Sequence, residues 1–250
     1  MEFSAKKVLL TEILHLRSLF LEEENTQIRY NAVHERNWSD SYLLSVDTRA
    51  VGYGSVMGQE RADRDTIFEY YILPSFRQFS SALFGTLLQE SKVSMIEAQS
   101  NNPLLSSMLF EFAEQIRSNV ILFSDHHSTD LAVPGANFRL RGDNDRLFKH
   151  HHEPEGTHVV EIDGLVVATG GFLLHYNKPF SDLYMEVSPE YRRQGIGSYL
   201  IQEVKKACYL SGRIPAARCD IENLASKSTL LKAGMQVSGY MLLGKAPKTG

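Results

Sequence analysis

The stretch Val187–Tyr199, which reads Val-Ser-Pro-Glu-Tyr-Arg-Arg-Gln-Gly-Ile-Gly-Ser-Tyr, constrains the fold of this chain more than any other. A β-rich run, Asp182–Val187, comes before it, and Pro189 ends that run because proline lacks a backbone donor. Apolar residues then recur at helical spacing, namely Leu200, Ile201, Val204 and Ala207. The segment therefore predicts a strand, a tight loop and the N-terminus of a helix.

The loop predicts an anion site. Gly195 and Gly197 allow unusual backbone angles and let another molecule approach the main chain closely. The first N–H groups of a helix have no partner within the helix and lie at the positive end of its dipole, and Arg192 and Arg193 add forked charged donors. Charge-assisted hydrogen bonds contribute about 1.5–3 kcal/mol each and the dipole about 0.3–1 kcal/mol, so several amides together outweigh the dipole. A pyrophosphate is the predicted ligand.

A glycine pair at a strand-to-helix turn also fits an ordinary turn before a well-capped helix. Other nucleotide-binding loops fit less well. The sequence contains no G-x-x-x-x-G-K-[ST], and Tyr199 and Leu200 stand where the dinucleotide fingerprint would need its third glycine.

Two motifs carry a resemblance to a known family. Arg192–Gly197 resembles the [Q/R]-x-x-G-x-[G/A] signature of the GNAT superfamily of acyl-CoA-dependent N-acyltransferases, and the preceding Val-Ser-Pro-Glu-Tyr is typical of it. Asn223–Ser226 and Lys232–Met235 resemble its second signature, an asparagine beside the cofactor and a K-x-G-F-like turn. The resemblance covers roughly the second half of the chain.

The resemblance implies an acetyl-CoA site with defined roles. By motif position, the Val187 amide would bind the thioester carbonyl or pantetheine, and Asn223 would contact the pantetheine arm. The pyrophosphate would lie on a group of loop residues: Arg192, Arg193, Gln194, Gly195, Ile196, Gly197 and Ser198.

The proton carriers stay open. Many family members place a tyrosine on the last helix just before K-x-G, but this sequence reads Leu230-Leu231-Lys232 there. The strand side chains on the same side as Val187 include no base; they are Met185, Leu183 and Ser181. Three titratable side chains are predicted to face the other way, namely Asp182, Tyr184 and Glu186. A water chain or a carboxylate from the first half would serve as well, so the catalytic residues are unknown.

The two halves of the chain resemble each other. Ile72–Gln78 parallels Val187–Arg193, and similar Gly-containing runs precede both. Phe79–Ala82, however, stands where Gln194–Gly197 stands in the second copy, which removes both loop glycines. We therefore predict two GNAT-like domains, a degenerate one at residues 1–132 and one with the acetyl-CoA site at residues 133–250. Chance similarity between two α/β segments is the alternative.

The predicted fold class is α/β (α+β), with a mixed, mostly antiparallel sheet flanked by helices in each domain. In the first half, periodicity predicts helices at 5–22, 80–92 and 102–116 and strands at 41–46, 50–57, 66–73 and 119–123. In the second half it predicts strands at 138–141, 157–162, 165–175, 182–187, 216–220 and 235–243 and helices at 194–211 and 225–233. Residues 124–144 are predicted as a linker. The second copy has too little chain at 143–155 for the two helices usual in the family.

Charge is distributed unevenly in a chain whose net charge is −4. Residues 137–250 carry 15 Lys and Arg against 12 Asp and Glu, and the remainder carries 11 against 18. A basic half suits a polyanion such as coenzyme A and an acidic half suits a cationic amine, although ordinary surface variation gives similar numbers. An acidic chain without basic runs argues against nucleic acid binding.

The remaining features predict a soluble cytoplasmic protein without a metal site. No stretch of 18 apolar residues occurs, and the N-terminus lacks a secretory pattern. Cys208 and Cys219 are predicted to be reduced and structural. The histidine runs His126–His127 and His150–His152 are predicted to lie in solvated loops, because adjacent histidines point apart and no ligand spacing completes a site.

The predicted function is an N-acetyltransferase that moves acetyl from acetyl-CoA to a primary amine by direct attack. A non-catalytic acyl-CoA sensor or interaction module on the same fold is the alternative. The acceptor stays open between a peptide, an antibiotic, a polyamine and an amino acid. So do the length of the acyl group and the oligomeric state.

Overall fold

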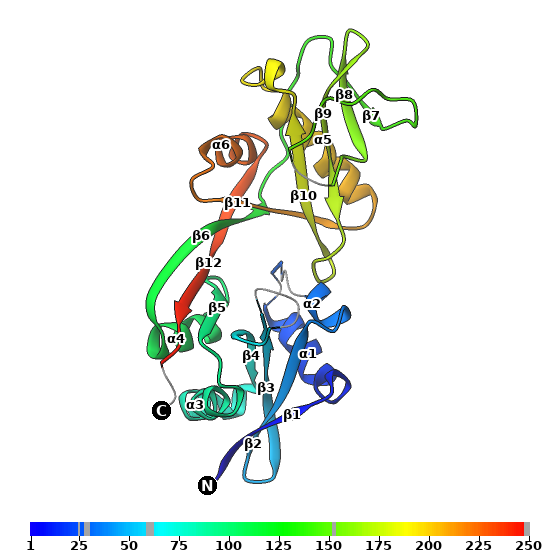
Figure 1. Cartoon of the computed structure of the whole chain (residues 1–250). Coiled ribbons are helices and arrows are strands. Elements are labelled where there is room, and N and C mark those ends of the chain that lie inside the picture. Colours follow the sequence, from blue (N-terminus) through cyan, green and yellow to red (C-terminus); the bar gives the residue numbers. More distant parts are fainter. Residues whose placement is uncertain (25, 28–30, 59–62, 152–153, 248–250) are drawn as a thin grey trace. The chain divides into compact units, whose positions relative to one another are not determined.

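A computed structural model describes residues 1–24, 26–27, 31–58, 63–151 and 154–247 of the chain. The chain divides into two compact units: unit 1 consists of Met1–Asn119 and Gly239–Gly250, and unit 2 consists of Val120–Ser238. Each unit contains a mixed β-sheet with helices against it (Figure 1). The predicted mixed α/β class is confirmed.

Unit 1 is built on strands in the order β1-β2-β3-β4-β5-β12. β4 and β5 run parallel, and the other neighbouring pairs run antiparallel. Its elements in chain order are β1 (Phe3–Val8), α1 (Leu10–Glu24), α2 (Asn31–Glu35), β2 (Ser39–Val46), β3 (Arg49–Met57), β4 (Thr66–Ile72), the 3₁₀ helix η1 (Pro74–Phe79), α3 (Ser80–Ser91), β5 (Met95–Gln99), α4 (Pro103–Phe112) and the first part of β6 (Glu114–Asp125), joined by the later part of β12 (Met235–Lys245).

Helices cover both faces of the unit 1 sheet. α3 packs so closely on one face that a Cβ added to Gly54 would lie 2.3 Å from the Leu87 side chain. Phe20 of α1 packs instead against Tyr53 and Tyr71, with ring centroids 6.2 and 6.1 Å away. Successive strand residues point to opposite faces, so the α1 side of the sheet is the one opposite α3.

A charged network is buried under α1. The Glu69 carboxylate, 1% exposed, accepts two hydrogen bonds of 3.0 Å from Arg17, one of 3.0 Å from the Tyr53 hydroxyl, and lies 2.9 Å from His34 Nε2. Burial alone would raise the pKa of Glu69, but Arg17 and His34 outweigh it and hold that pKa well below its usual range. The network therefore joins α1, α2, β3 and β4 through one ionised carboxylate.

Unit 2 is built on strands in the order β6-β11-β10-β9-β8-β7, in which β10 and β11 run parallel. α5 covers one face: the Leu200 side chain lies 3.2 Å from the position of a Cβ on Gly170. Its elements are the later part of β6, β7 (Asn137–Leu140), β8 (His158–Ile162), β9 (Leu165–Leu173), β10 (Phe180–Val187), the 3₁₀ helix η2 (Pro189–Tyr191), α5 (Ile196–Leu210), β11 (Ile214–Asp220), α6 (Leu224–Lys232) and the first part of β12. No helix forms between β7 and β8 among the residues described there.

The two repeats exchange their last strands. β6 follows the first repeat, yet its residues Val120–Ser124 pair with Ala216–Asp220 of β11. β12 follows the second repeat, yet Met241–Lys245 pair with Met95–Gln99 of β5. The division between the compact units therefore falls inside β6 and β12, and differs from the boundary expected between residues 132 and 133.

Most predicted elements are present, and two helices begin or end elsewhere. The helix predicted for 5–22 begins only at Leu10, because Phe3–Val8 pair with Ser41–Val46 of β2 as a strand. The helix predicted for 102–116 ends at Phe112, since Ala113 takes an extended backbone and β6 begins at Glu114. In both segments the spacing of the apolar residues fits a helix as well as a strand. Periodicity alone therefore did not distinguish the two.

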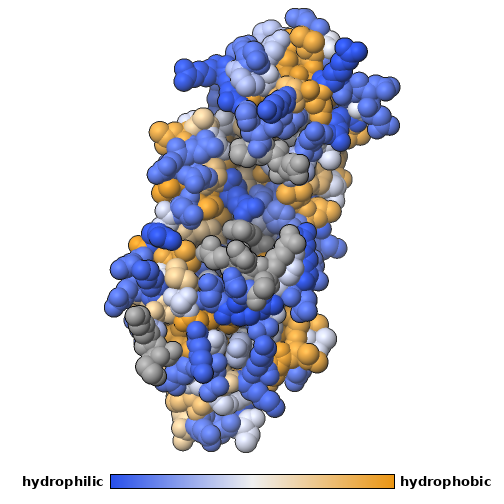
Figure 2. Space-filling view, viewed as in Figure 1, coloured by the Kyte–Doolittle hydropathy of each residue, from blue (hydrophilic) through white to orange (hydrophobic). Residues whose placement is uncertain are grey.

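Hydrophilic residues cover most of the face shown in Figure 2, with hydrophobic ones in patches between them. Across the part of the chain that the structure describes, no helix is both long enough and apolar enough to cross a membrane.

The buried network makes a stability prediction. Arg17→Met should lower the free energy of unfolding at pH 7 by about 3–5 kcal/mol, because it leaves Glu69 buried without its main partner. Lys7→Met is the control: it breaks the exposed Lys7–Asp40 pair and should cost at most about 1 kcal/mol. Urea denaturation measures both, and equal losses would contradict the assignment.

The pH dependence should follow from the lowered pKa of Glu69. A carboxyl whose folded-state pKa is lowered contributes stability above its ordinary value of 4.5 and loses it as the pH falls. The wild type should therefore lose stability below that pH more steeply than Arg17→Met does.

Candidate functional site

The chain turns sharply between β10 and α5 in unit 2. Pro189 begins the short helix η2, and two residues of the following loop then take left-handed backbone angles: Arg193 at φ 64° and Gly195 at φ 83°. Side chains rarely tolerate this region, and glycine adopts it without strain. A Cβ on Gly195 would meet nothing closer than Lys232 Nζ at 3.9 Å, so it would project into open space at the mouth of the loop.

Six consecutive backbone N–H groups of this loop are unpaired. The first hydrogen bond of α5 runs from Tyr199 N to Gly195 O. None of the N–H groups of residues 193–198 donates to another described residue. These donors lie at the positive end of a 15-residue helix, so together they could hold an anion.

Three cations surround these amides. Arg192 donates through Nε to the Val187 carbonyl at 3.1 Å, which leaves the rest of its guanidinium free to bind a ligand. Arg193 and Lys232 form no ion pair with a described carboxylate, and both are exposed. Two arginines and a lysine beside unpaired amides suit a diphosphate.

Lys232 was missed as a site residue, although the sequence contained its signal. It belongs to the Lys232-Ala-Gly234 turn, where Gly234 has φ 84° and a Cβ would lie 2.2 Å from the His127 carbonyl oxygen. The buried Lys205 of α5 donates to the carbonyls of His127 and Ala233, both at 2.9 Å. This packing fixes the end of α6 beside the loop, and so places the Lys232 amine near Gly195.

The other predicted loop residues have different surroundings. A Cβ on Gly197 would lie 3.2 Å from both Met185 and Thr229, so this glycine allows close packing of α5 against β10 and α6, and does not adopt a left-handed angle. Ile196 is 1% exposed in the core. The Ser198 hydroxyl donates to the Thr229 carbonyl at 3.2 Å, so its amide, not its side chain, is available to a ligand.

The parallel pair β10–β11 opens into a gap beside the loop. Pairing stops at Asp182 with Ala216. Ser188 N donates to Val167 O on β9, and antiparallel pairs alternate, so the N–H groups of Val187 and Met185 point away from β9 towards the gap. Two strand amides therefore face this gap, as the predicted role of Val187 requires.

Asn223 lies across the gap at the start of α6. Its side-chain oxygen accepts from Ser226 N at 3.0 Å and so caps the helix. The side chain is exposed, and its amide nitrogen makes no hydrogen bond with a described residue. Asn223 can therefore donate to a ligand while its oxygen holds the helix.

A titratable cluster lies at the closed end of the gap. Asp182 is 4% exposed, and its Oδ2 lies 3.1 Å from His175 Nε2 and 3.2 Å from Arg218 Nε. Its other oxygen, Oδ1, is buried without a hydrogen-bond partner. Met185 and Val187 face α5, so Asp182, Tyr184 and Glu186 face the opposite side of the sheet, as strand alternation predicts.

Two histidines of the segment that precedes β8, His150 and His151, reach this opposite face. The His151 amide donates to both Glu186 carboxylate oxygens at 3.0 and 3.1 Å, and His150 Nε2 lies 2.7 Å from the Thr169 hydroxyl. The expectation of solvated histidines is wrong for His150, which is half-buried and stacks on Phe148 at 4.4 Å. His152 lies outside the described residues.

Cysteine and metal chemistry contribute nothing further to the site. Cys208 and Cys219 are unpaired and buried. Burial raises the pKa of the Cys208 thiol to about 11 and that of Cys219 in the same direction, which keeps both protonated at neutral pH. Among the residues described, no group of three or more His, Cys, Asp or Glu side chains is arranged to hold a metal ion.

The corresponding turn of unit 1 has no such amide cluster. η1 runs directly into α3, Ser80 N donates to Arg77 O, and no residue between Pro74 and Leu83 has a positive φ. Phe79 packs against Phe3 with ring centroids 5.7 Å apart. The residues that replace the two glycines therefore build a continuous helix and close the anion site.

Comparisons with known proteins agree with this geometry. The acetyltransferase (GNAT) family matches residues 124–235. None of the curated proteins matches the chain.

Solved structures match over nearly the whole chain. An acetyltransferase of the GNAT family from Colwellia psychrerythraea has a TM-score of 0.74 at 14% identity, covering 98% of this chain and 100% of that one. A GCN5-related N-acetyltransferase from Sphaerobacter thermophilus has a TM-score of 0.63 at 15% identity, covering 98% and 96%. A tandem GNAT protein from the clavulanic acid biosynthesis pathway has a TM-score of 0.63 at 11% identity, covering 100% of both chains.

At such identities the structural likeness shows the fold. The family match and the anion site fall on the same stretch of chain. Residues 124–235 are therefore a GNAT acetyltransferase domain, in a chain whose fold over its whole length is that of GNAT acetyltransferases.

Proposed function

We propose that this protein is an N-acetyltransferase that transfers the acetyl group of acetyl-CoA to a primary amine by direct attack. Family membership supports acyl transfer in general. The observation that carries the cofactor is the run of six unpaired amides at residues 193–198 beside Arg192, Arg193 and Lys232. A Cβ at Gly195 would fill this space, so the loop fits a diphosphate.

Different residues of unit 2 would bind different parts of the cofactor. The amides of Gln194, Gly195, Ile196, Gly197 and Ser198, with the cations beside them, would hold the pyrophosphate. The N–H groups of Val187 and Met185 and the side-chain amide of Asn223 would bind the pantetheine arm in the gap. Acetyl-CoA supplies the activated thioester, so the protein's tasks are to orient the amine, polarise the carbonyl and accept a proton.

The proton acceptor is proposed to be His175. Its Nε2 lies 3.1 Å from Asp182 Oδ2 without the alignment of a hydrogen bond, and its Nδ1 bonds to no described residue, so the ring has a nitrogen available to take a proton. Asp182 acts as a positioning residue, and its Oδ2 also lies 3.2 Å from Arg218 Nε. The position before K-x-G has no tyrosine: Leu230 and Leu231 stand there, and neither side chain can carry a proton. The His175 cluster is therefore left to do the proton transfer.

Three further assignments belong to this proposal. The acceptor is a small-molecule or peptide amine, neither nucleic acid nor a membrane is a partner, and the protein acts in the cytoplasm. Unit 1 is the degenerate copy, because its turn has lost the unpaired amides. A non-catalytic acyl-CoA sensor is the second candidate, favoured by the absent tyrosine alone.

The first prediction of this proposal concerns the loop between β10 and α5. Gly195→Val should weaken binding of coenzyme A by about 100-fold, or about 2.7 kcal/mol, because its side chain would occupy the diphosphate position. Gly212→Val is the matched control: Gly212 also has a left-handed φ of 74° with no atom within 4 Å of a Cβ, but lies at the other end of α5. Calorimetry should find its affinity unchanged, and equal losses in both variants would contradict the assignment of the loop.

The second prediction separates enzyme from sensor. Purified protein mixed with acetyl-CoA and a panel of amines should release free thiol above background with at least one acceptor, and mass spectrometry should find that acceptor heavier by one acetyl group. The panel contains a peptide, a polyamine, an amino acid and an aminoglycoside. Tight acetyl-CoA binding without thiol release from any of them would favour the sensor.

The third prediction tests the proton acceptor. His175→Gln should lower kcat by about 100-fold and leave the affinity for coenzyme A unchanged, whereas the control His126→Gln, in an exposed loop, should change neither. Asp182→Asn should also shift the His175 ring nitrogen resonances in ¹⁵N NMR, because it removes the carboxylate that lies 3.1 Å from Nε2. Unchanged kcat in His175→Gln would remove this residue from the mechanism.

A further inference from the structure

Arg218 of β11 carries a guanidinium group that is only partly used within unit 2. Its Nε lies 3.2 Å from Asp182 Oδ2, and its side chain is 32% exposed. Its other two nitrogens, Nη1 and Nη2, make no hydrogen bond with a described residue. Arg218 is therefore held through one nitrogen and has two more to offer to a ligand.

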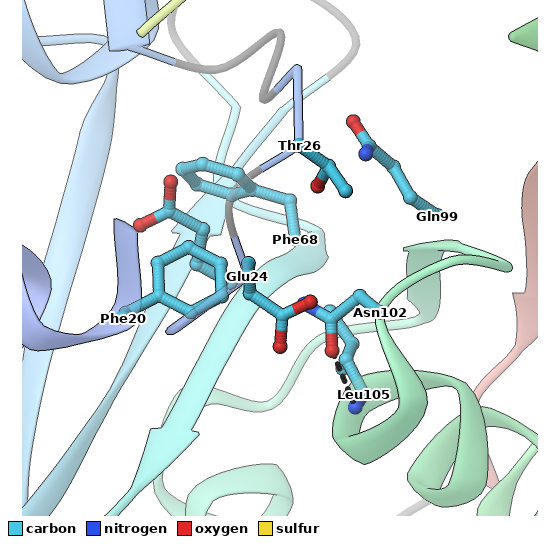
Figure 3. A pocket seen from close by; sticks show the side chains of 8 residues that line it. Phe20, Glu24, Thr26, Phe68, Gln99, Asn102 and Leu105 are labelled. Carbon is cyan, nitrogen blue, oxygen red and sulfur yellow. Dashed lines mark hydrogen bonds between the residues drawn. The ribbon is translucent and has the colours of Figure 1, made fainter. Parts of the chain in front are cut away.

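Arg17 of unit 1 provides the contrast of an arginine with a purely structural role. It donates from both Nε and Nη2 to the Glu69 carboxylate at 3.0 Å, and its side chain is only 7% exposed. The pocket that Glu69 lines, between α1, β4, β5 and the start of α4, encloses room for about one water molecule (Figure 3). The charged network of unit 1 is therefore closed to a larger ligand, whereas Arg218 is neither buried nor paired in this way.

His175 lies against the same carboxylate oxygen as Arg218. Its Nε2 is 3.1 Å from Asp182 Oδ2, its side chain is 20% exposed, and its Nδ1 makes no hydrogen bond with a described residue. Because both side chains approach one oxygen, the imidazole and the guanidinium group are neighbours. The proposed proton acceptor therefore has a partly exposed cation beside it.

The strand register places Arg218 at the edge of the gap between β10 and β11. Asp182 pairs with Ala216, which is the last pair before the two strands diverge. Arg218 follows Ala216 by two residues in a strand that continues to pair with β6, so it faces the same side of the sheet as Asp182, opposite α5. An acceptor that enters the gap from this side meets His175 and Arg218 together.

We propose that the acceptor is a free amino acid, whose carboxylate binds Nη1 and Nη2 of Arg218 while its amine is directed at His175. A guanidinium group binds a carboxylate through two parallel hydrogen bonds, and this fork fixes the orientation of the bound group. A polyamine has no carboxylate, and a peptide carries its terminal carboxylate and its terminal amine on different residues. The inference rests on the acetyl transfer proposed for unit 2 and narrows its acceptor.

The carboxylate of the amino acid takes no part in bond making. The amine nitrogen forms a bond to the acetyl carbon of the thioester, and the C–S bond breaks. One proton of the amine passes to His175, and coenzyme A leaves as a thiolate that then takes up a proton. Arg218 holds the acceptor so that its amine lies beside His175, which is the positioning that direct attack requires.

The kinetic test compares each primary-amine amino acid with its own carboxamide, using the full chain and acetyl-CoA. The best amino acid should have a kcat/KM at least about tenfold above that of its carboxamide. Arg218→Gln should raise the KM of that amino acid about 30-fold and leave the KM of the carboxamide within about threefold, so the preference is lost. A merely structural role of Arg218 would change both acceptors alike.

Arg139→Gln is the matched control for this substitution. Arg139 is also 32% exposed and also paired with carboxylates, those of Asp145 and Glu161, but it lies on the edge strand β7. Its loss should leave the preference for the amino acid over the carboxamide unchanged.

A binding test without catalysis separates this proposal from the transfer itself. N-acetylglycine carries the carboxylate and no reactive amine, so it should shift the Arg218 Nε–H resonance saturably in ¹⁵N–¹H NMR, in the wild type and in Gly195→Val, whereas N-acetylglycinamide should not. Saturable binding without acetyl transfer to any amino acid would contradict the function proposed for unit 2 and still support the carboxylate site. Equal use of amino acids and carboxamides, or no shift at Arg218, would overturn the proposal.

Discussion

In both units, one parallel strand pair that stops early determines what the fold can do. β4 and β5 pair over two residues, and β10 and β11 over three. Beyond that point the strands diverge, so backbone N–H groups on the inner edge lose their partners, which a buried sheet does not normally allow. A ligand that lies between the strands can satisfy them. The helix that follows the first strand of each pair is α5 in unit 2 and α3 in unit 1.

The two units differ at the turn that follows the first strand of the parallel pair. In unit 2, Gly195 takes a left-handed angle just before α5, and the six N–H groups of residues 193–198 donate to no described residue. In unit 1, η1 continues into α3 without any left-handed residue, and Phe79 packs on Phe3. The unit 2 turn thus leaves backbone N–H groups that could bind an anion, whereas the unit 1 turn continues as a helix.

The fold class and the tight turn with its left-handed glycine could be predicted from the sequence because local signals carry them. Pro189, the glycines and the adjacent arginines act within a few residues of one another, and the K-x-G turn lies where its motif places it. The roles of single residues depend on the tertiary structure and were missed. Gly197 faces Met185 and Thr229, Lys232 reaches the loop only because Lys205 anchors the end of α6, and the His175–Asp182 contact joins a loop to a strand.

The strand exchange could not be predicted for a related reason. β6 and β12 have similar apolar patterns, and no local signal tells a strand which of two equivalent neighbours to pair with. Since β6 supplies the neighbour of β11 and β12 supplies the neighbour of β5, the second strand of each parallel pair is flanked by a strand that the other repeat contributes. Neither repeat can complete its sheet from its own sequence.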